Sequence, residues 1–328
     1  MFKAKFSLDP WVIALIALVG NGIVILQGAV VRATGSGAGC GRHWPTCNGE
    51  IIPLNPSIET VIEFSHRLLS SGVLLIGVFL LVAAFRNRKA MPGFFVFAVL
   101  SFIFLLIEAA LGAVTVLLEL TGDDDSLARG LMVPSHLVNS LLLVGALSLS
   151  LVYAHAYKRG SAPWPLRIRR QSLLSTVLGL GILGMLFLMF TGGIAALGNT
   201  LFPSESLQEG LAADFNAQSH IFIRLRILHP LIAISVGVYL FISLGLSWWM
   251  KPVPRAKRST QALLAVYILQ VIVGTFNLAF LAPTVLQILH LLLAVVAFAL
   301  LSAVCAYSLG GKPEEAPVLK DLKAQATS

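Results

Sequence analysis

The stretch "EFSHRLLSSGVLLIGVFLL", residues 63–81, decides the fold, because "RILHPLIAISVGVYLFISL", residues 226–244, repeats its pattern. In both stretches a histidine opens an apolar run long enough to cross a membrane as a helix. Two further pairs follow the same order: "LIEAALGAVTVLL" from Leu106 with "YILQVIVGTFNLAF" from Tyr267, and "VPSHLVNSLLLVGALSL" from Val133 with "VLQILHLLLAVVAFAL" from Val285. The chain therefore contains an internal repeat.

The composition indicates a membrane protein. Of 328 residues, 57% are hydrophobic and only 12% are charged, against about 25% charged in soluble domains. Apolar runs predict spanning helices near 11–31, 59–85, 92–118, 132–157, 172–197, 221–249, 261–281 and 284–309. The first run is interpreted as a retained helix, because no small-residue cleavage site follows it. We expect an all-α integral membrane protein, with eight transmembrane helices in two pseudo-symmetric four-helix bundles.

The distribution of charge predicts the orientation. The net charge of +8 does not point to nucleic acid, because 17 of the 23 basic residues lie at the termini and in alternate connections. We expect the protein to lie in the cell membrane. By the positive-inside rule, both termini face the cytoplasm and the loop with Cys40 and Cys47 is extracytoplasmic. The predicted units are an N-terminal half (1–157), a basic linker (158–171), a C-terminal half (172–309) and a cytoplasmic tail (310–328).

Four of the seven histidines recur at matching places in the repeat. His66, His136, His229 and His290 lie near the outer starts of the second, fourth, sixth and eighth predicted helices. Neutral imidazole binds haem iron, and a four-helix bundle can enclose the macrocycle. A lone histidine at a membrane interface is more often a packed residue, but four in a repeat favour ligands. The remaining three, at 43, 155 and 220, are interpreted as loop or interface residues.

The two halves differ next to their first histidines. Glu63 lies three residues before His66, whereas Arg226 lies three residues before His229. Residues i and i+3 share a helix face, so a carboxylate that can move protons is expected at the first site. A guanidinium that can neutralise haem propionates is expected at the second. The first half is therefore predicted to do chemistry and the second to hold an electron-carrying haem. Alternatively, Glu63 simply pairs with Arg67. Further propionate candidates are Arg32, Arg67 and Arg224.

Other matched positions carry weaker signals. Glu108 and Gln270 correspond within the third and seventh predicted helices. Glu108 is either a proton relay or a residue packed against Thr115 and backbone carbonyls. Gly112 and Gly274 follow these positions by four residues and would allow helices to approach closely. The free Cys305 is interpreted as a small core residue.

Glycine spacing also supports the repeat. Gly28 precedes His66 by 38 residues, and Gly193 precedes His229 by 36 residues. We therefore expect Gly28 and Gly193 to be equivalent positions on the first helix of each half.

The segments "GAVVRATGSGAGCGRHWPTCNGEIIP", "IEFSHRLLSSG", "PSHL", "RILHP" and "LQILHLLLA" resemble those of the heme A synthase family. The resemblance covers residues 20 to 309. It implies two similar four-helix halves and oxidation of the C8 methyl group of heme O to a formyl group, giving heme A for cytochrome oxidase. It also implies a haem b held by His229 and His290, a substrate haem near His66 and His136, and an essential Glu63.

The resemblance extends to the first outer loop. Some members of the family carry a cysteine pair there, which corresponds to a disulfide between Cys40 and Cys47. A second pair found in other members is missing between Gly198 and His220. A zinc site formed by Cys40, His43 and Cys47 is an alternative, although three ligands at irregular spacing disfavour it. The loop is interpreted as a disulfide-pinned lid over the substrate haem, with a spacer or a thiol-redox role as alternatives.

The predicted reaction is stepwise oxidation of the heme O methyl group, assisted by Glu63, His66 and His136. Arg67 and Arg32 are assigned to the substrate haem and Arg226 to the haem b site. Candidate partners are a heme O synthase, a quinol or other electron donor, and a second copy of the chain. Two rival functions remain: a cytochrome b that only transfers electrons, and a haem transporter or chaperone.

Overall fold

A computed structural model describes residues 9–159, 172–250 and 253–310. These residues form helices and no β-strand, and eight helices are long and apolar enough to cross a membrane. The predicted all-α membrane fold with eight spanning helices is confirmed. The elements are α1 (Pro10–Ala33), a short 3-10 helix η1 (Ser36–Ala38), α2 (Ile58–Asn87), α3 (Pro92–Leu117), α4 (Leu127–Lys158), α5 (Ser172–Leu201), α6 (Leu207–Phe215), α7 (Ile221–Arg226), α8 (Leu228–Met250), α9 (Pro254–Ala279) and α10 (Thr284–Leu309).

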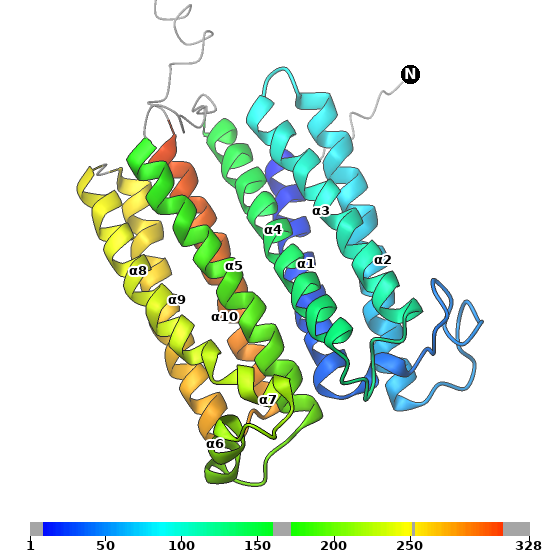
Figure 1. The fold of residues 1–328 in the computed structure, drawn as a ribbon. Helices are drawn as coiled ribbons and strands as arrows, with labels where there is room; N and C mark the ends of the chain where they lie inside the picture. The colour runs from blue at the N-terminus through cyan, green and yellow to red at the C-terminus, as the bar shows by residue number, and fades with distance from the viewer. Residues whose placement is uncertain (1–8, 160–171, 251–252, 311–328) are drawn as a thin grey trace, which may run out of the picture.

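The helices form two groups that lie side by side. Helices α1 to α4 occupy one side of the molecule, and α5, α8, α9 and α10 occupy the other (Figure 1). One hydrophobic core lies within the first group, and a second core joins α4 to the helices of the second group. Helix α4 packs against α1, α3, α5 and α10. Its most apolar stretch is 72% buried, against 39% or less in the other seven spanning helices, so α4 is the central helix.

Polar contacts fix the ends of the helices. Asp9 caps α1 by accepting a hydrogen bond from the Trp11 N–H, and Lys158 at the end of α4 donates to Asp9 at 2.7 Å. The hydrogen bond from Lys158 holds the pKa of Asp9 below its usual value. At the opposite end of the molecule, the loop after α1 and the segment α6–α7 lie on the same side (Figure 1). Residues 160–171 of the predicted linker and 311–328 of the predicted tail lie outside the described residues.

Helix α4 begins five residues earlier than predicted. Ser126 caps it by accepting from the Arg129 N–H at 3.2 Å, and the helix continues through Pro134. Proline lacks an N–H, so one hydrogen bond of the helix backbone is missing there. A Cβ at Gly193 would lie 3.0 Å from the Pro134 Cα. Gly193 therefore allows α5 to approach α4 closely where the two groups of helices meet.

The sixth predicted helix is interrupted before its histidine. Helix α7 ends at Arg226, and α8 begins at Leu228. The cause is Pro230, which has no N–H to donate to the carbonyl of Arg226. In the first group the residue after the equivalent histidine is Arg67, and α2 runs without a break. The sequence analysis also missed the short helix α6.

Candidate functional site

The two histidines of the second group pack against glycines of neighbouring helices. A Cβ at Gly192 of α5 would lie 2.9 Å from Cε1 of His229, and a Cβ at Gly274 of α9 would lie 2.7 Å from Cε1 of His290. Any larger side chain would displace the imidazole rings. The prediction that paired Gly193 with this histidine is therefore wrong by one residue, because Gly193 faces α4 instead.

The first group repeats the arrangement. A Cβ at Gly28 of α1 would lie 3.1 Å from Cε1 of His66, and a Cβ at Gly112 of α3 would lie 3.6 Å from Nε2 of His136. Each of the four histidines thus has a glycine beside its ring, on the first or the third spanning helix of its half. The interpretation of Gly112 as a plain helix-packing residue is incomplete, because it also provides space for an imidazole.

The geometry of the second pair fits a haem. The ring centroids of His229 and His290 lie 6.2 Å apart, with the rings 81° to one another. An iron bound between two imidazoles needs two metal–nitrogen bonds of about 2 Å each. Each nitrogen lies about 1 Å from the centre of its ring, so the two ring centroids should be about 6 Å apart. Thr191 Oγ1 lies 3.3 Å from Nδ1 of His229, which leaves Nε2 available. The buried Nδ1 of His290 has no hydrogen-bond partner, while its Nε2 contacts Gln270 at 3.1 Å.

The first pair has a carboxylate beside it. Glu108 Oε1 lies 3.3 Å from Nδ1 of His136, although the two atoms are not aligned as a hydrogen bond. Glu108 also accepts hydrogen bonds from Asn139 Nδ2 and Ser140 Oγ. The buried Nδ1 of His66 has no partner. The hydrogen-bond partners of Glu108 therefore come from α4. Thr115 donates to the carbonyl of Leu111 instead of packing against Glu108 through a hydrogen bond.

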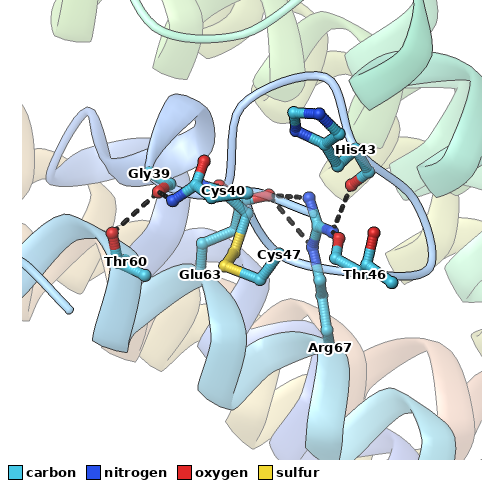
Figure 2. A network of polar contacts seen from close by, with 9 residues as sticks. Gly39, Cys40, His43, Thr46, Cys47, Thr60, Glu63 and Arg67 are labelled. Atoms are coloured by element: carbon cyan, nitrogen blue, oxygen red, sulfur yellow. Dashed lines mark hydrogen bonds and ion pairs between the residues drawn. A yellow bond between two sulfur atoms is a disulfide. The ribbon is translucent and has the colours of Figure 1, made fainter. Parts of the chain in front are cut away.

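Glu63 is tied to the cysteine loop. Figure 2 shows its side chain beside the disulfide that joins Cys40 to Cys47. The Cys40 N–H donates to Oε2 of Glu63 at 2.8 Å, and Arg67 pairs with Oε1, its Nε at 3.1 Å. The Glu63 side chain is 5% exposed. The pairing of Glu63 with Arg67, considered above as an alternative, is thus observed. The shared face of Glu63 and His66 stays a prediction.

Arg67 continues this network into the loop. Its Nη1 donates to the carbonyls of His43 and Thr46 at 2.6 Å each (Figure 2). A Cβ at Gly39 would lie 2.5 Å from the carbonyl carbon of Glu59, so only glycine allows this approach to α2. The loop therefore contacts the first three turns of α2. The zinc alternative is wrong, because the two cysteines are bonded to each other and the described residues hold no cluster of three metal ligands.

The arginines differ from the sequence-based assignments. Arg226 pairs with Asp214 and donates to Asn199 Oδ1 and the carbonyl of Gly210, so its charge is already neutralised within the α6–α7 segment. The assignment of Arg226 to the haem b site stays a prediction. Arg224 is exposed. Arg32, assigned to the first site, instead donates its hydrogen bonds to α5 and α10.

Three polar residues of the two sites were missed in the sequence. Asn139 and Ser140 follow His136 by three and four residues and contact Glu108. Helical spacing alone could have identified them, because positions i+3 and i+4 share the face of the histidine. Thr191, on another helix, contacts His229 through the fold, and no local pattern points to it.

Comparisons with known proteins agree with this arrangement. A Thermus thermophilus protein named protoheme IX farnesyltransferase is 44% identical over 278 residues, covering 84% of this chain and 45% of that protein. This chain thus spans less than half of the length of that relative. A Bacillus cereus heme A synthase is 46% identical over 94 residues, 29% of this chain and 30% of that protein. Residues 11–302 match the cytochrome oxidase assembly protein family COX15-CtaA, and the chain belongs to this family.

Proposed function

We propose that this member of the COX15-CtaA family is a heme A synthase, a membrane enzyme that oxidises the C8 methyl group of heme O to a formyl group. The observation that carries the proposal is the asymmetry between two otherwise matching sites. Both halves place two histidines beside two glycines, but among the described residues only a first-half histidine contacts a carboxylate, Glu108 against His136, and Glu63 precedes His66 by three residues. The named similarity to a heme A synthase supports the same conclusion.

The conversion of a methyl group to an aldehyde is a four-electron oxidation. In the proposed route, two successive hydroxylations each use one molecule of dioxygen with two electrons and two protons from the donor and release one water. The resulting diol then loses water to give the aldehyde. We assign the substrate haem to His66 and His136. Haem iron supplies one-electron and oxygen chemistry when bound. Glu63 is the proton acceptor of the proposal, because it is a buried carboxylate of the first half, and Arg67 and the Cys40 N–H hold it in a fixed position. Arg67 acts through Glu63 and the loop, rather than on the haem directly.

A haem b between His229 and His290 is proposed to pass electrons to or from the first site. The 6.2 Å ring separation and the two glycines fit this role. No carboxylate pairs with either histidine among the described salt bridges. Arg226 is proposed as a structural residue of the outer segment, since Asp214 already pairs with it.

The cysteine loop is proposed to act as a lid over the first site. The disulfide closes the loop, and the Cys40 N–H and Arg67 connect it directly to Glu63. We assign this loop and the α6–α7 segment to the extracytoplasmic side of the cell membrane and the termini to the cytoplasm. The relative named protoheme IX farnesyltransferase supports a farnesyl-transferring partner that supplies the substrate. A quinol is the proposed electron donor, and a homo-oligomer is the proposed assembly.

The test is to express the full chain with a heme O source and to identify the extracted haems by mass. The wild type should yield heme A, and Glu63→Gln should retain haem but yield no heme A. The matched control is Glu59→Gln, because Glu59 lies one turn earlier on the same helix and is exposed. Normal heme A formation by Glu63→Gln would refute the role of Glu63.

The same extraction separates the rival functions. A cytochrome b that only transfers electrons would return the supplied haem chemically unchanged in every variant. A haem transporter or chaperone would also leave the haem unchanged and would release it readily during purification. A wild-type protein that yields heme A excludes both.

A further inference from the structure

Arg32 crosses from the first group of helices to the second. It lies in the last turn of α1, and its Nη1 donates to the carbonyl of Ala196 at 2.8 Å and to Thr200 Oγ1, both on α5. Its Nη2 donates to Gln287 Oε1 on α10 at 2.6 Å. The guanidinium is therefore held by the second half, although the chain supplies it from the first.

These contacts place the guanidinium over the second histidine pair. Ala196 follows Gly192, the glycine beside His229, by four residues, and Gln287 precedes His290 by three. Residues three or four apart share a helix face, and one turn is about 5.4 Å. The Arg32 guanidinium thus lies about one helical turn from both imidazoles, at the end of the bundle where α1 and α5 finish and α10 begins (Figure 1).

The charge of Arg32 has no acidic partner among the described residues. The acceptors of its hydrogen bonds are two neutral side chains and a carbonyl. By contrast, Arg67 pairs with Glu63, and Arg226 pairs with Asp214. An unneutralised charge inside a membrane protein is costly and usually marks a ligand pathway or site.

A second buried arginine adds to the positive charge. Arg129 at the start of α4 is 4% exposed and interacts electrostatically with Arg32. Its Nη1 donates to the carbonyls of Gly122 and Asp124, while its buried Nε has no hydrogen-bond partner. Asp123 and Asp124 lie near Arg129, but neither pairs with Arg32. The pair of guanidinium groups therefore favours an anion next to Arg32.

We propose that Arg32, with Arg129 behind it, binds a propionate carboxylate of the haem held by His229 and His290. The proposal rests on the haem b site described above and moves Arg32 from the substrate haem to the second haem. A guanidinium can bind a carboxylate through two parallel N–H donors. The second site is then completed by a residue of the first half, so the C-terminal half alone lacks part of its own haem site.

The test compares haem b with its dimethyl ester, which carries no propionate charge. The full chain with His66→Ala and His136→Ala, purified from a haem-deficient host, leaves only the second site for titration by visible absorbance. This protein should bind the free acid about 10- to 100-fold more tightly than the ester. Adding Arg32→Gln should reduce the affinity for the acid to that for the ester, and should leave ester binding unchanged. Arg32→Lys should keep part of the preference for the free acid, since lysine keeps the positive charge but lacks the two parallel N–H donors of the guanidinium.

The control is Arg258→Gln, an exposed arginine near the start of α9 whose loss should not alter either affinity. Equal weakening of acid and ester by Arg32→Gln would show a structural role and overturn the proposal, as would an absence of preference in the starting protein. The titration needs no conversion of heme O. A chain that prefers the acid but makes no heme A would therefore refute the proposed activity while supporting this site.

Discussion

The glycines beside the four histidines give a graded prediction. Carbon–carbon contacts are optimal at about 3.5–4.0 Å. A Cβ would lie 2.7 Å from the ring of His290 in Gly274→Ala, 2.9 Å from His229 in Gly192→Ala, 3.1 Å from His66 in Gly28→Ala and 3.6 Å from His136 in Gly112→Ala. The first two rings must therefore move by about 0.6 to 0.8 Å, the third by about 0.4 Å and the fourth not at all.

The cost follows from the displacement. Inserting a methyl group into a packed interior costs about 1–3 kcal/mol, and each 1.4 kcal/mol changes an equilibrium constant about tenfold. We expect Gly274→Ala and Gly192→Ala to weaken haem binding in the second half by about 10- to 100-fold. Gly28→Ala should have a smaller effect in the first half, and Gly112→Ala should be close to neutral.

The assay is haem titration by visible absorbance, with one site removed at a time. Gly192→Ala and Gly274→Ala are tested in the chain with His66→Ala and His136→Ala, and Gly28→Ala and Gly112→Ala in the chain with His229→Ala and His290→Ala. The control is Gly179→Ala on α5, the helix of Gly192, where a Cβ would meet nothing within 4 Å. This change should leave haem binding intact and stabilise the helix slightly, because alanine is the better helix former. If Gly112→Ala weakens binding as much as Gly274→Ala, the glycines do not act through the imidazole rings.

Three further predictions concern the contacts of the two sites. Glu108→Gln should raise the reduction potential of the first-half haem, because a carboxylate beside a ligand histidine increases the basicity of that histidine. Gln270→Glu should lower the reduction potential of the second-half haem for the same reason. Spectroelectrochemical titration that finds both potentials unchanged would contradict the contact of these side chains with ligand histidines. Replacing Cys40 and Cys47 with serine should destabilise the protein by about 2.5 kcal/mol, from closure of a loop with a separation of 7 residues. Thermal unfolding would measure the loss, and full heme A formation at every temperature would favour the spacer interpretation of the loop. Asp214→Asn should destabilise the α6–α7 segment by about 1–3 kcal/mol, because it removes the acidic partner of the Arg226 guanidinium. Unaltered protease sensitivity of the segment would disprove this.

The sequence predicts the spanning helices well and pairs the four histidines by position, for clear physical reasons. Long apolar runs have few alternatives to membrane helices, and the repeat gives each histidine a counterpart. Side-chain direction is harder to predict. A shift of one residue rotates a helix position by about 100°, which is why Gly193 faces Pro134 while Gly192 faces His229. The partners of long side chains are harder still to predict, because Arg32 donates to acceptors that are 164 and 255 residues later in the sequence.

The assignment of Arg226 shows how a local rule fails at a helix break. The rule that i and i+3 share a face holds only in a continuous helix, and Pro230 interrupts the ladder between Arg226 and His229. The side chain of Arg226 is therefore free to pair with Asp214. The first half has no proline at the equivalent position, so Glu63 stays on an unbroken α2.

The same break explains how the two halves come to differ in charge. In the first half, α2 carries Glu63 in the second turn of an intact helix, directly beneath the cysteine loop. In the second half, the equivalent charge is paired with Asp214, so Arg226 is not available as a free cation for the histidines of this half. Arg32 provides that cation from α1, across the interface between the halves. On this reasoning, a chain that keeps Arg226 but loses Arg32 should lose its preference for a charged haem, and a chain that keeps Arg32 but loses Arg226 should retain it.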